Sequence, residues 1–314
     1  MPLRIVFCGT PKFAVPSLRH LLAQPDFKIV GVVTQPDRPR GRSLAISSSP
    51  VKEAAVAGGV PVYQPAKIKS DEAFEFFKQA APDAVVIIAY GQIIPQRLIE
   101  IPRLGWINLH GSLLPKYRGA APIHRAIMNG ENRTGLTTMN IDAGLDTGPV
   151  LLRFETEIGA DETAPELYSR LSEAGAPLVV ETVRGLHSGT ITSKPQDSSQ
   201  ASFAPPLKKE EGRIDWSLMA QQIYNRIRGL QPWPGAFSSF RGKNCGIWGR
   251  PVSPTAAVSV PPGQILKANG NVVVACGAGT SLLLEFVQLE GRKRVTAIEF
   301  ANGAHLAPDD RFDT

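Results

Sequence analysis

Short apolar runs alternate with amphipathic segments through the first half of the chain. Continuously apolar runs are typical of parallel strands buried on both faces of a sheet, and the segments between them have helical character. The predicted strands cover residues 3–10, 27–34, 83–90 and 105–112. The predicted helices cover residues 13–24, 51–58 and 71–80. This alternation predicts an α/β fold, a doubly wound Rossmann-like domain whose ligands bind beyond the carboxyl ends of the strands.

The pattern breaks near residue 190. Residues 190–206, TITSKPQDSSQASFAPP, are rich in Ser, Gln and Pro and hold few large apolar side chains, which predicts a linker. Beyond it, short β-rich runs recur between Gly and Pro residues, as in a small barrel. We therefore expect a first domain over residues 1–189 and a smaller β-barrel domain over residues 207–314.

One helix is expected at the start of the second domain. Its apolar side chains repeat at helical spacing and form one stripe, Met219, Ile223, Ile227 and Leu230. We expect this stripe to pack in a core and Arg228 to lie on the opposite face of the helix.

Composition places the chain among globular proteins. Its 314 residues exceed one typical domain, and 43% of them are hydrophobic while 20% are charged, which is enough apolar material for one or two sizeable cores. No apolar run approaches the roughly 20 residues needed to span a bilayer, and the N-terminus passes into strand-like sequence without a cleavable signal pattern. We expect a cytoplasmic protein without a membrane partner.

The positive charge is concentrated in the C-terminal part. Residues 1–204 contain 21 basic and 19 acidic side chains, whereas residues 205–314 contain 13 and 9. An excess of this kind suits contact with a polyanion such as a nucleic acid. A basic face that meets only solvent is the alternative.

The cysteines argue against a disulfide framework and against a zinc site. Cys8, Cys245 and Cys276 are odd in number, isolated, and without CxxC or His-rich spacing. We expect Cys8 to be buried and the chemistry of the protein to need no metal.

Three side chains suited to acyl or formyl transfer occur in two neighbouring segments. Asn108 and His110 lie two residues apart in a predicted strand, so both project from one side near its end. Asp146 lies in the Gly-rich segment DAGLDTG, from which a carboxylate can reach the imidazole. An amide can stabilise an oxyanion, and an imidazole can exchange a proton near neutral pH. Each residue alone could be an ordinary structural polar residue, but their combination predicts a catalytic site.

Arg38, Arg40 and Arg42 occur together in QPDRPRGRSLAISSS, a segment rich in Pro, Gly and Ser. This composition predicts an exposed loop, in which arginines can meet phosphate groups. A solvated loop without a partner is the alternative.

The chain resembles the folate-dependent formyltransferases. The resemblance rests on NLHGSLLPKYRGAAPI and IDAGLDTG and extends to the N-terminal RIVFCGTPKFAVPSL, the TQPDRPRGR loop, SPVK and GRIDWS, so it covers nearly the whole sequence. Within this superfamily the sequence is most similar to the methionyl-tRNA formyltransferase family. It departs from the family pattern after the arginines, where SLAISSS stands in place of the usual lysines.

The resemblance implies a substrate pair and a set of site residues. The formyl group would pass from 10-formyltetrahydrofolate to the amino group of methionine on initiator tRNA, for translation initiation. The catalytic residues implied are Asn108, His110 and Asp146. The folate contacts implied are Ser112, Leu113, Leu114 and Pro115. The residues implied to enter the tRNA acceptor stem are Arg38, Arg40 and Arg42.

The same resemblance assigns roles to the two domains. Residues 1–189 would be the formyltransferase catalytic domain, and residues 207–314 a tRNA-binding domain similar to an OB-fold. A monomer is expected.

Three other functions remain open at this point. A formyltetrahydrofolate hydrolase would use the same side chains with water as acceptor, and a sugar-nucleotide N-formyltransferase would use a small amine. An RNA-binding protein without enzymatic activity is the third. The arginine segment and the basic C-terminal part favour a tRNA acceptor.

Overall fold

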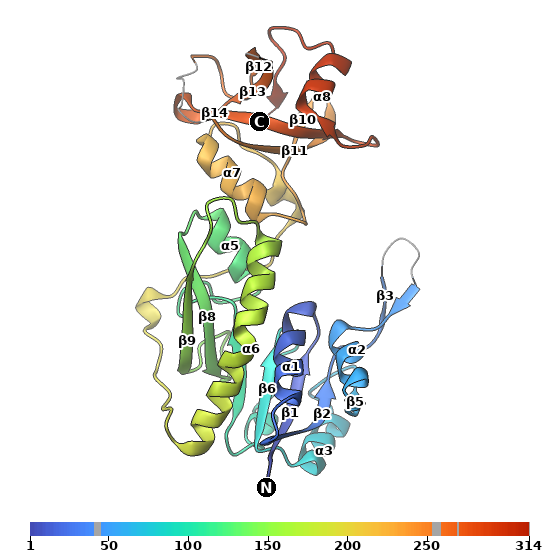
Figure 1. Cartoon of the computed structure of the whole chain (residues 1–314), viewed down its shortest axis with the longest axis vertical. Coiled ribbons are helices and arrows are strands. Elements are labelled where there is room, and N and C mark those ends of the chain that lie inside the picture. The colour runs from blue at the N-terminus through green and yellow to red at the C-terminus, as the bar shows by residue number, and fades with distance from the viewer. Residues whose placement is uncertain (41–44, 253–258, 269, 314) are drawn as a thin grey trace. The chain divides into compact units, whose positions relative to one another are not determined.

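The computed structural model describes residues 1–40, 45–252, 259–268 and 270–313, and the chain within these ranges divides into two units (Figure 1). The first unit comprises Met1–Pro122, Arg133–Glu157 and Leu167–Pro205. The second unit comprises Ile123–Asn132, Ile158–Glu166 and Pro206–Thr314. Two short segments of the N-terminal part, Ile123–Asn132 and Ile158–Glu166, therefore belong to the second unit. Among the described helices, none has both the length and the apolar composition of a membrane span.

A seven-stranded sheet forms the centre of the first unit, in the order β5-β2-β1-β6-β7-β8-β9. The pairings from β5 to β7 are parallel, and those of β7 with β8 and of β8 with β9 are antiparallel. The parallel core with its flanking helices confirms the predicted Rossmann-like fold. The strands are β1 (Leu3–Gly9), β2 (Phe27–Val33), β5 (Val62–Tyr63), β6 (Ala84–Ile88), β7 (Trp106–His110), β8 (Arg133–Asn140) and β9 (Val150–Glu157).

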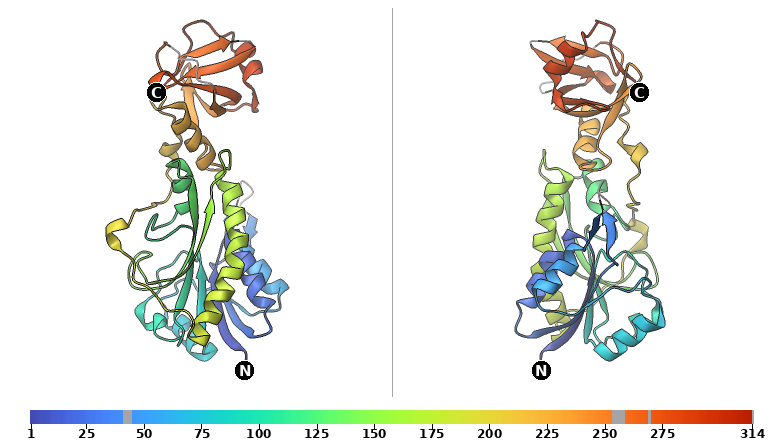
Figure 2. Two further views of the ribbon diagram at one scale, coloured as in Figure 1. Left: turned by 60° about the vertical axis from the view of Figure 1, so that its left-hand side comes forward. Right: turned by 90° about the vertical axis from the view of Figure 1, so that its right-hand side faces the viewer.

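Helices cover both faces of this sheet (Figure 2). On one face, Phe77 packs on Trp106 of β7 with ring centroids 5.1 Å apart, and the indole Nε1 donates to Leu98 O at 2.8 Å. On the other face, a Cβ at Gly175 would lie 2.5 Å from Leu109 Cδ2. These helices are α1 (Val15–Leu22), α2 (Pro50–Ala57), α3 (Asp71–Ala80), α4 (Gln96–Ile99) and α6 (Ala164–Ser188). The short 3-10 helices among the described residues of both units are η1 (Lys12–Ala14), η2 (Ser198–Gln200), η3 (Lys209–Gly212) and η4 (Gly277–Gly279).

The arginine segment contains a two-stranded hairpin. β3 (Arg38–Arg40) pairs antiparallel with β4 (Ala45–Ser47), so the prediction of a loop throughout this segment is wrong. Pro39 is compatible with β3 because a strand with one neighbour does not need every backbone N–H. Arg38 is exposed. Arg42 lies outside the described residues.

The segment predicted as a linker runs along the first unit up to Pro205. The backbones of Lys194 and Val150 exchange two hydrogen bonds, each 2.8 Å long. Farther on, Phe203 forms a parallel bridge with Arg118. The segment has few apolar side chains because its backbone polar groups, rather than a hydrophobic stripe, attach it to the unit.

A curled antiparallel sheet forms the centre of the second unit, which confirms the predicted small barrel-like fold. Its order is β12-β13-β14-β11-β10-β16, with β15 paired to β14. Trp216 stacks on Phe312 and Phe240 meets Phe300 edge-on in the core, with ring centroids 5.5 and 5.1 Å apart. The elements are α7 (Ala220–Gly229), β10 (Phe237–Phe240), β11 (Lys243–Pro251), β12 (Ile265–Ala268), β13 (Asn271–Ala275), β14 (Ser281–Leu289), β15 (Val295–Thr296), α8 (Ala297–Gly303) and β16 (Phe312–Asp313).

Helix α7 is buried on two sides. Three residues of the predicted apolar stripe are buried, and Met219, which precedes the helix, is exposed. Arg228 is buried as well, because residues 158–166 cover the polar face of the helix. Its guanidinium donates to Gly159 O at 3.2 Å and to Glu162 O at 3.0 Å. Burial lowers the pKa of Arg228.

Helix α5 (Pro122–Met128) is attached to the C-terminal part of the second unit by charged and polar contacts. Both terminal nitrogens of Arg125 donate to the carboxylate of Glu211, with Nη2 at 3.0 Å from Oε1. His124 Nδ1 lies 2.7 Å from Gly229 O. The hydrogen bonds from Arg125 hold the pKa of the Glu211 carboxyl below its usual range against the opposing effect of burial.

We predict that Glu211→Gln lowers the Tm at pH 7 by about 3–6 °C, because it removes a charge-assisted pair worth about 1.5 kcal/mol. A lowered carboxyl pKa contributes stability that is complete above the unfolded-state value of about 4.3 and is lost as the pH falls through the folded-state value. The Tm difference between wild type and variant, followed by circular dichroism, should therefore shrink below about pH 4.

The matched control is Glu210→Gln, a change at the exposed neighbouring carboxylate. It should leave the Tm within about 1 °C of wild type. A Tm difference between wild type and Glu211→Gln that stays the same from pH 7 to well below pH 4 would contradict the proposed charge pairing.

Candidate active site

Strand β7 carries Asn108 and His110 on one side of the sheet. Its side chains alternate, so Trp106 shares their side and Leu109 faces helix α6. Within the sheet Asn108 pairs with Met139 of β8 and His110 pairs with Thr137. The two polar side chains therefore lie near the carboxyl end of β7, where a doubly wound sheet places its ligands.

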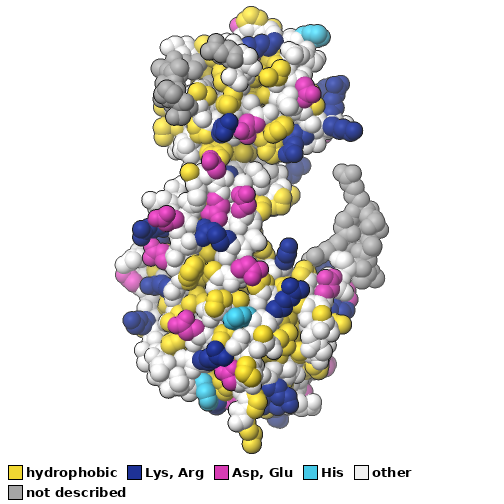
Figure 3. All heavy atoms as spheres, viewed as in Figure 1, with side chains coloured by type: hydrophobic (Ala, Val, Ile, Leu, Met, Phe, Trp, Pro, Cys, Tyr) yellow, Lys and Arg dark blue, Asp and Glu magenta, His cyan; other side chains and the backbone are white. Residues whose placement is uncertain are grey.

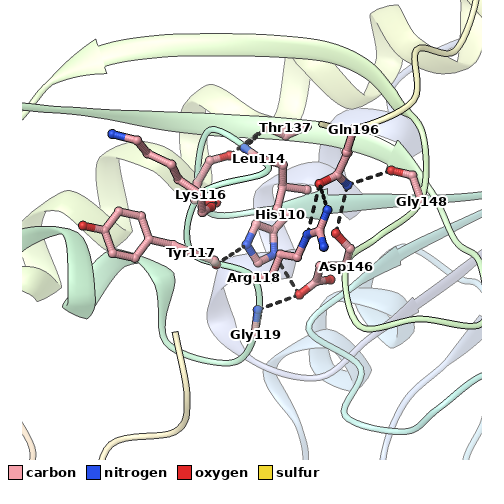
Figure 4. Close-up of polar contacts among 11 residues, drawn as sticks. His110, Leu114, Lys116, Tyr117, Arg118, Gly119, Thr137, Asp146, Gly148 and Gln196 are labelled. Atoms are coloured by element: carbon pink, nitrogen blue, oxygen red, sulfur yellow. Dashed lines mark hydrogen bonds and ion pairs between the residues drawn. The ribbon is translucent and has the colours of Figure 1, made fainter. Parts of the chain in front are cut away.

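The imidazole of His110 is held between two oxygen atoms (Figure 4). Nε2 lies 2.9 Å from Tyr117 O, and Nδ1 lies 3.5 Å from Asp146 Oδ2. The second distance is within reach of an ion pair and longer than a direct hydrogen bond. A protonated ring can donate to both oxygens, whereas a neutral ring can donate to one of them. The ring is 6% exposed, so its orientation is set by these contacts.

Asp146 occupies a strained position in the loop after β8. Its φ is 50°, in the left-handed region, which costs a residue with a Cβ about 1 kcal/mol. The carboxylate Oδ2 accepts a hydrogen bond from Gly119 N at 2.8 Å. This bond and the contact with His110 place one carboxylate oxygen between a backbone N–H and the imidazole.

The loop around Asp146 is built from local hydrogen bonds and close backbone contacts. Asp142 Oδ1 accepts from Gly144 N at 3.0 Å and from Thr147 Oγ1 at 2.7 Å. A Cβ at Gly148 would lie 1.7 Å from Asn140 O, so this position requires glycine. The segment DAGLDTG thus has a structural reason for two of its polar residues and one of its glycines.

The side-chain amide of Asn108 is available for a ligand. It is half-buried, and within the part of the chain that the structure describes it makes no hydrogen bond. An amide N–H group at the end of β7, on the same side as His110, can donate to an oxyanion formed beside the imidazole.

The segment Ser112–Pro115 begins two residues after the end of β7, and its members differ in what they can offer a ligand. Thr137 Oγ1 donates to Ser112 O at 2.7 Å and accepts from Leu114 N at 3.1 Å. Ser112 and Leu114 are buried, and Leu114 packs with the core of the first unit. Leu113 and Pro115 are half-buried. Ser112 and Leu114 therefore shape the segment, and Leu113 and Pro115 keep accessible apolar surface.

The cysteines are buried thiols, Cys8 among them, as predicted. Burial raises the pKa of Cys245 and of Cys276 to about 12. In the described ranges no three side chains of His, Cys, Asp or Glu gather where they could hold a metal ion.

Two residues of the site were not singled out by sequence reasoning. Arg118 donates from Nε and Nη2 to Gln196 Oε1 at 3.2 and 2.9 Å, and Gln196 Nε2 donates to Asp146 O at 2.9 Å (Figure 4). Arg118 lies in KYRGAAP, part of the motif that carries the family resemblance, so its place in the sequence could have indicated a role in the site. Gln196 lies in the segment predicted as a linker, where its sequence neighbours give no indication of a role.

Two family models match most of the chain. The model described as formyl transferase matches residues 3–183, and the model described as formyl transferase, C-terminal domain, matches residues 206–305. Both parts of the chain therefore have counterparts in one family.

Solved structures with the same fold include two that were determined with folates. A sugar 3N-formyl transferase, WlaRD, studied in the presence of dTDP and 5-N-formyl-THF, has a TM-score of 0.67 and 18% identity over 93% of this chain and 100% of that protein. HypX from Aquifex aeolicus, in complex with tetrahydrofolic acid, has a TM-score of 0.61 and 17% identity over 96% of this chain and 47% of that protein. At such identities the likeness establishes the fold alone.

Relatives with much higher identity extend along the whole chain. The methionyl-tRNA formyltransferase of Solibacter usitatus (strain Ellin6076) is 53% identical over 311 residues, which are 99% of this chain and 98% of the relative. That of Koribacter versatilis (strain Ellin345) is 51% identical over 301 residues, 95% of each chain. The chain belongs to the formyl transferase family, in the group of the methionyl-tRNA formyltransferases.

Proposed function

We propose that this protein transfers the formyl group of 10-formyltetrahydrofolate to the α-amino group of methionyl initiator tRNA. The observation that carries the proposal is end-to-end identity with relatives of that name, 53% in one case, together with the His110–Asp146 pair at the end of β7. A hydrolase or a sugar-nucleotide N-formyltransferase is less well supported, because the relatives at 53% and 51% identity are named methionyl-tRNA formyltransferases, whereas a solved sugar formyl transferase shares only the fold at 18% identity.

The chemistry needs a site for negative charge and a site for a proton. When the amine attacks the formyl carbon, a C–N bond forms, the carbonyl oxygen becomes negative and the amine nitrogen becomes positive. Asn108 donates to the oxyanion. His110, held by Asp146, accepts the proton of the amine and returns it to the donor nitrogen as the bond from that nitrogen to the formyl carbon breaks. A free α-amino group has a pKa of about 7.7–8.0, so part of it is already neutral at neutral pH and needs orientation more than activation.

The folate donor would lie against the segment after β7. Of the four residues implied by resemblance, Leu113 and Pro115 keep accessible apolar surface that can contact the donor. Ser112 and Leu114 support the segment from inside through Thr137 and the core.

The tRNA would be bound by basic side chains of two parts of the chain. Arg38 is exposed on β3, and with Arg40 and Arg42 it supplies guanidinium groups suited to phosphates. On the face drawn in Figure 3, Lys and Arg side chains of the second unit gather along one edge, with acidic side chains interspersed. A catalytic domain over residues 1–189, a linker over 190–206 and a tRNA-binding domain over 207–314 remain our assignment, as do a monomeric state and a cytoplasmic location.

The direct test is incubation of the protein with 10-formyltetrahydrofolate and methionyl initiator tRNA, with mass spectrometry of the released amino acid. Formylmethionine is expected. Parallel reactions contain water alone or an amino sugar-nucleotide as acceptor. Donor consumption without tRNA would support the hydrolase, and formylation of the sugar in preference to methionine would support the sugar-nucleotide enzyme.

We predict that His110→Ala and Asp146→Ala lower kcat by about 10²–10⁴, the usual contribution of a positioned general acid or base. Asn108→Ala should lower kcat by about 10²–10³, as for loss of an oxyanion donor. Steady-state kinetics measures both effects, with circular dichroism to confirm folding. The control is His187→Ala, at an exposed position of α6, with wild-type rates expected. Near-normal turnover by His110→Ala would reject the assignment.

We predict that Arg42→Ala and Arg38→Ala each raise the KM for methionyl-tRNA about tenfold, the effect of losing one charge-assisted hydrogen bond. The increase should diminish in high salt, because phosphate contacts are screened and exchange with counterions. The KM for the folate should stay within about twofold. Arg19→Ala, an exposed arginine of α1, is the control. A raised folate KM with an unchanged tRNA KM would count against a tRNA role for these arginines.

A further inference from the structure

We propose that Gln196 and Arg118 are positioning residues for Asp146, a role that rests on the proposed function of the His110–Asp146 pair. Neither residue needs to touch substrate. Both act through hydrogen bonds that fix the turn carrying the carboxylate (Figure 4). Their loss would therefore change the rate of formyl transfer more than the binding of either substrate.

The side-chain amide of Gln196 uses its full hydrogen-bonding capacity. Nε2 donates to Asp146 O at 2.9 Å and to Gly148 O at 2.7 Å. Oε1 accepts from Nε and Nη2 of Arg118 at 3.2 and 2.9 Å. A primary amide has two N–H hydrogens and two oxygen lone pairs, so each hydrogen and each lone pair of Gln196 has a partner. Because the two carbonyls lie on either side of Thr147, one amide fixes both sides of the turn.

Arg118 determines which way this amide points. The residue is 5% exposed, and its guanidinium has donors only. The oxygen of Gln196 must therefore face Arg118, and its nitrogen must face the turn. A carboxylate at position 196 would bind the guanidinium more strongly but would have no hydrogen for the two carbonyls. The neutral amide is the side chain that satisfies both partners.

The backbone on either side of Arg118 holds the His110–Asp146 pair directly. Tyr117 O contacts His110 Nε2 at 2.9 Å, and Gly119 N donates to Asp146 Oδ2 at 2.8 Å. The contacts thus form a closed circuit, in which the side chain at 118 fixes the turn and the neighbouring backbone groups fix the imidazole and the carboxylate. This circuit keeps the left-handed conformation at Asp146 populated.

The first test compares Gln196→Met, Gln196→Glu and Gln200→Met in steady-state kinetics. Gln196→Met keeps the length of the side chain and removes its hydrogen bonds, and should lower kcat about 10–100-fold with both KM values within about twofold. Gln196→Glu keeps an acceptor for Arg118 and loses the donors to the turn, so it should also be slow. Gln200→Met, at an exposed position of the same segment, should behave as wild type. A fully active Gln196→Glu would restrict Gln196 to pairing with Arg118 and would overturn the proposal.

The second test is a double-mutant cycle with Asp146→Ala. If Gln196 acts through Asp146, Gln196→Met should lower kcat by less than about twofold in the Asp146→Ala background. Equal losses in both backgrounds would mean a general effect on folding and would overturn the proposal.

A third measurement does not depend on turnover. Hydrogen exchange of the Gly119 amide, which binds the Asp146 carboxylate, should become at least about tenfold faster in Gln196→Met and in Asp146→Ala, while exchange of the β7 amides stays unchanged. Wild-type exchange in Gln196→Met would overturn the proposal. Failure of the wild-type protein to formylate any acceptor would reject the proposed function, while the exchange data would still decide whether Gln196 positions the turn.

Discussion

The direction of β8 is the constraint on which the geometry of the site depends. Because β8 runs antiparallel to β7, the loop after β8 starts beside the amino end of β7, where Ile141 N donates to Trp106 O at 2.9 Å. Asp146 nevertheless reaches His110 at the carboxyl end of that strand. His110 lies four positions after Trp106 along the extended strand, a span of about 13 Å, so the loop has to return along β7.

A loop that returns across a sheet cannot be held by strand pairing alone. Here it is held by its own internal turn at Asp142 and by contacts from two other places in the sequence, the backbone N–H of Gly119 and the amide of Gln196. Gln196 belongs to the extended segment after α6, whose backbone pairs with β9 through Lys194. The segment that connects the two parts of the chain thus contributes to the site itself.

The sequence allowed prediction of those features that depend on local periodicity. The apolar runs located β1, β2, β6 and β7, and the two-residue spacing of Asn108 and His110 placed both on one face of a strand. It could not reveal partners that are distant in the chain. Arg118 and Gln196 are 78 residues apart, and Arg125 and Glu211 are 86 apart. The burial of Arg228 was missed for the same reason, since its acceptors lie in residues 158–166. Polar contacts of this range depend on the completed fold and leave no periodic signal.

The second unit is assembled from three separate segments of the chain, and this has a consequence for recombination between related genes. The chain passes from one unit to the other at five peptide positions, so a crossover near residue 206 exchanges only part of that unit. In such a chimera Glu211 of one parent would face Arg125 of the other. The buried guanidinium of Arg228 would likewise face the backbone carbonyls of residues 158–166 from the other parent. Compatible exchange of C-terminal parts is therefore confined to parents that share these partners, unless helix α5 and residues 158–166 are exchanged together with the C-terminal part.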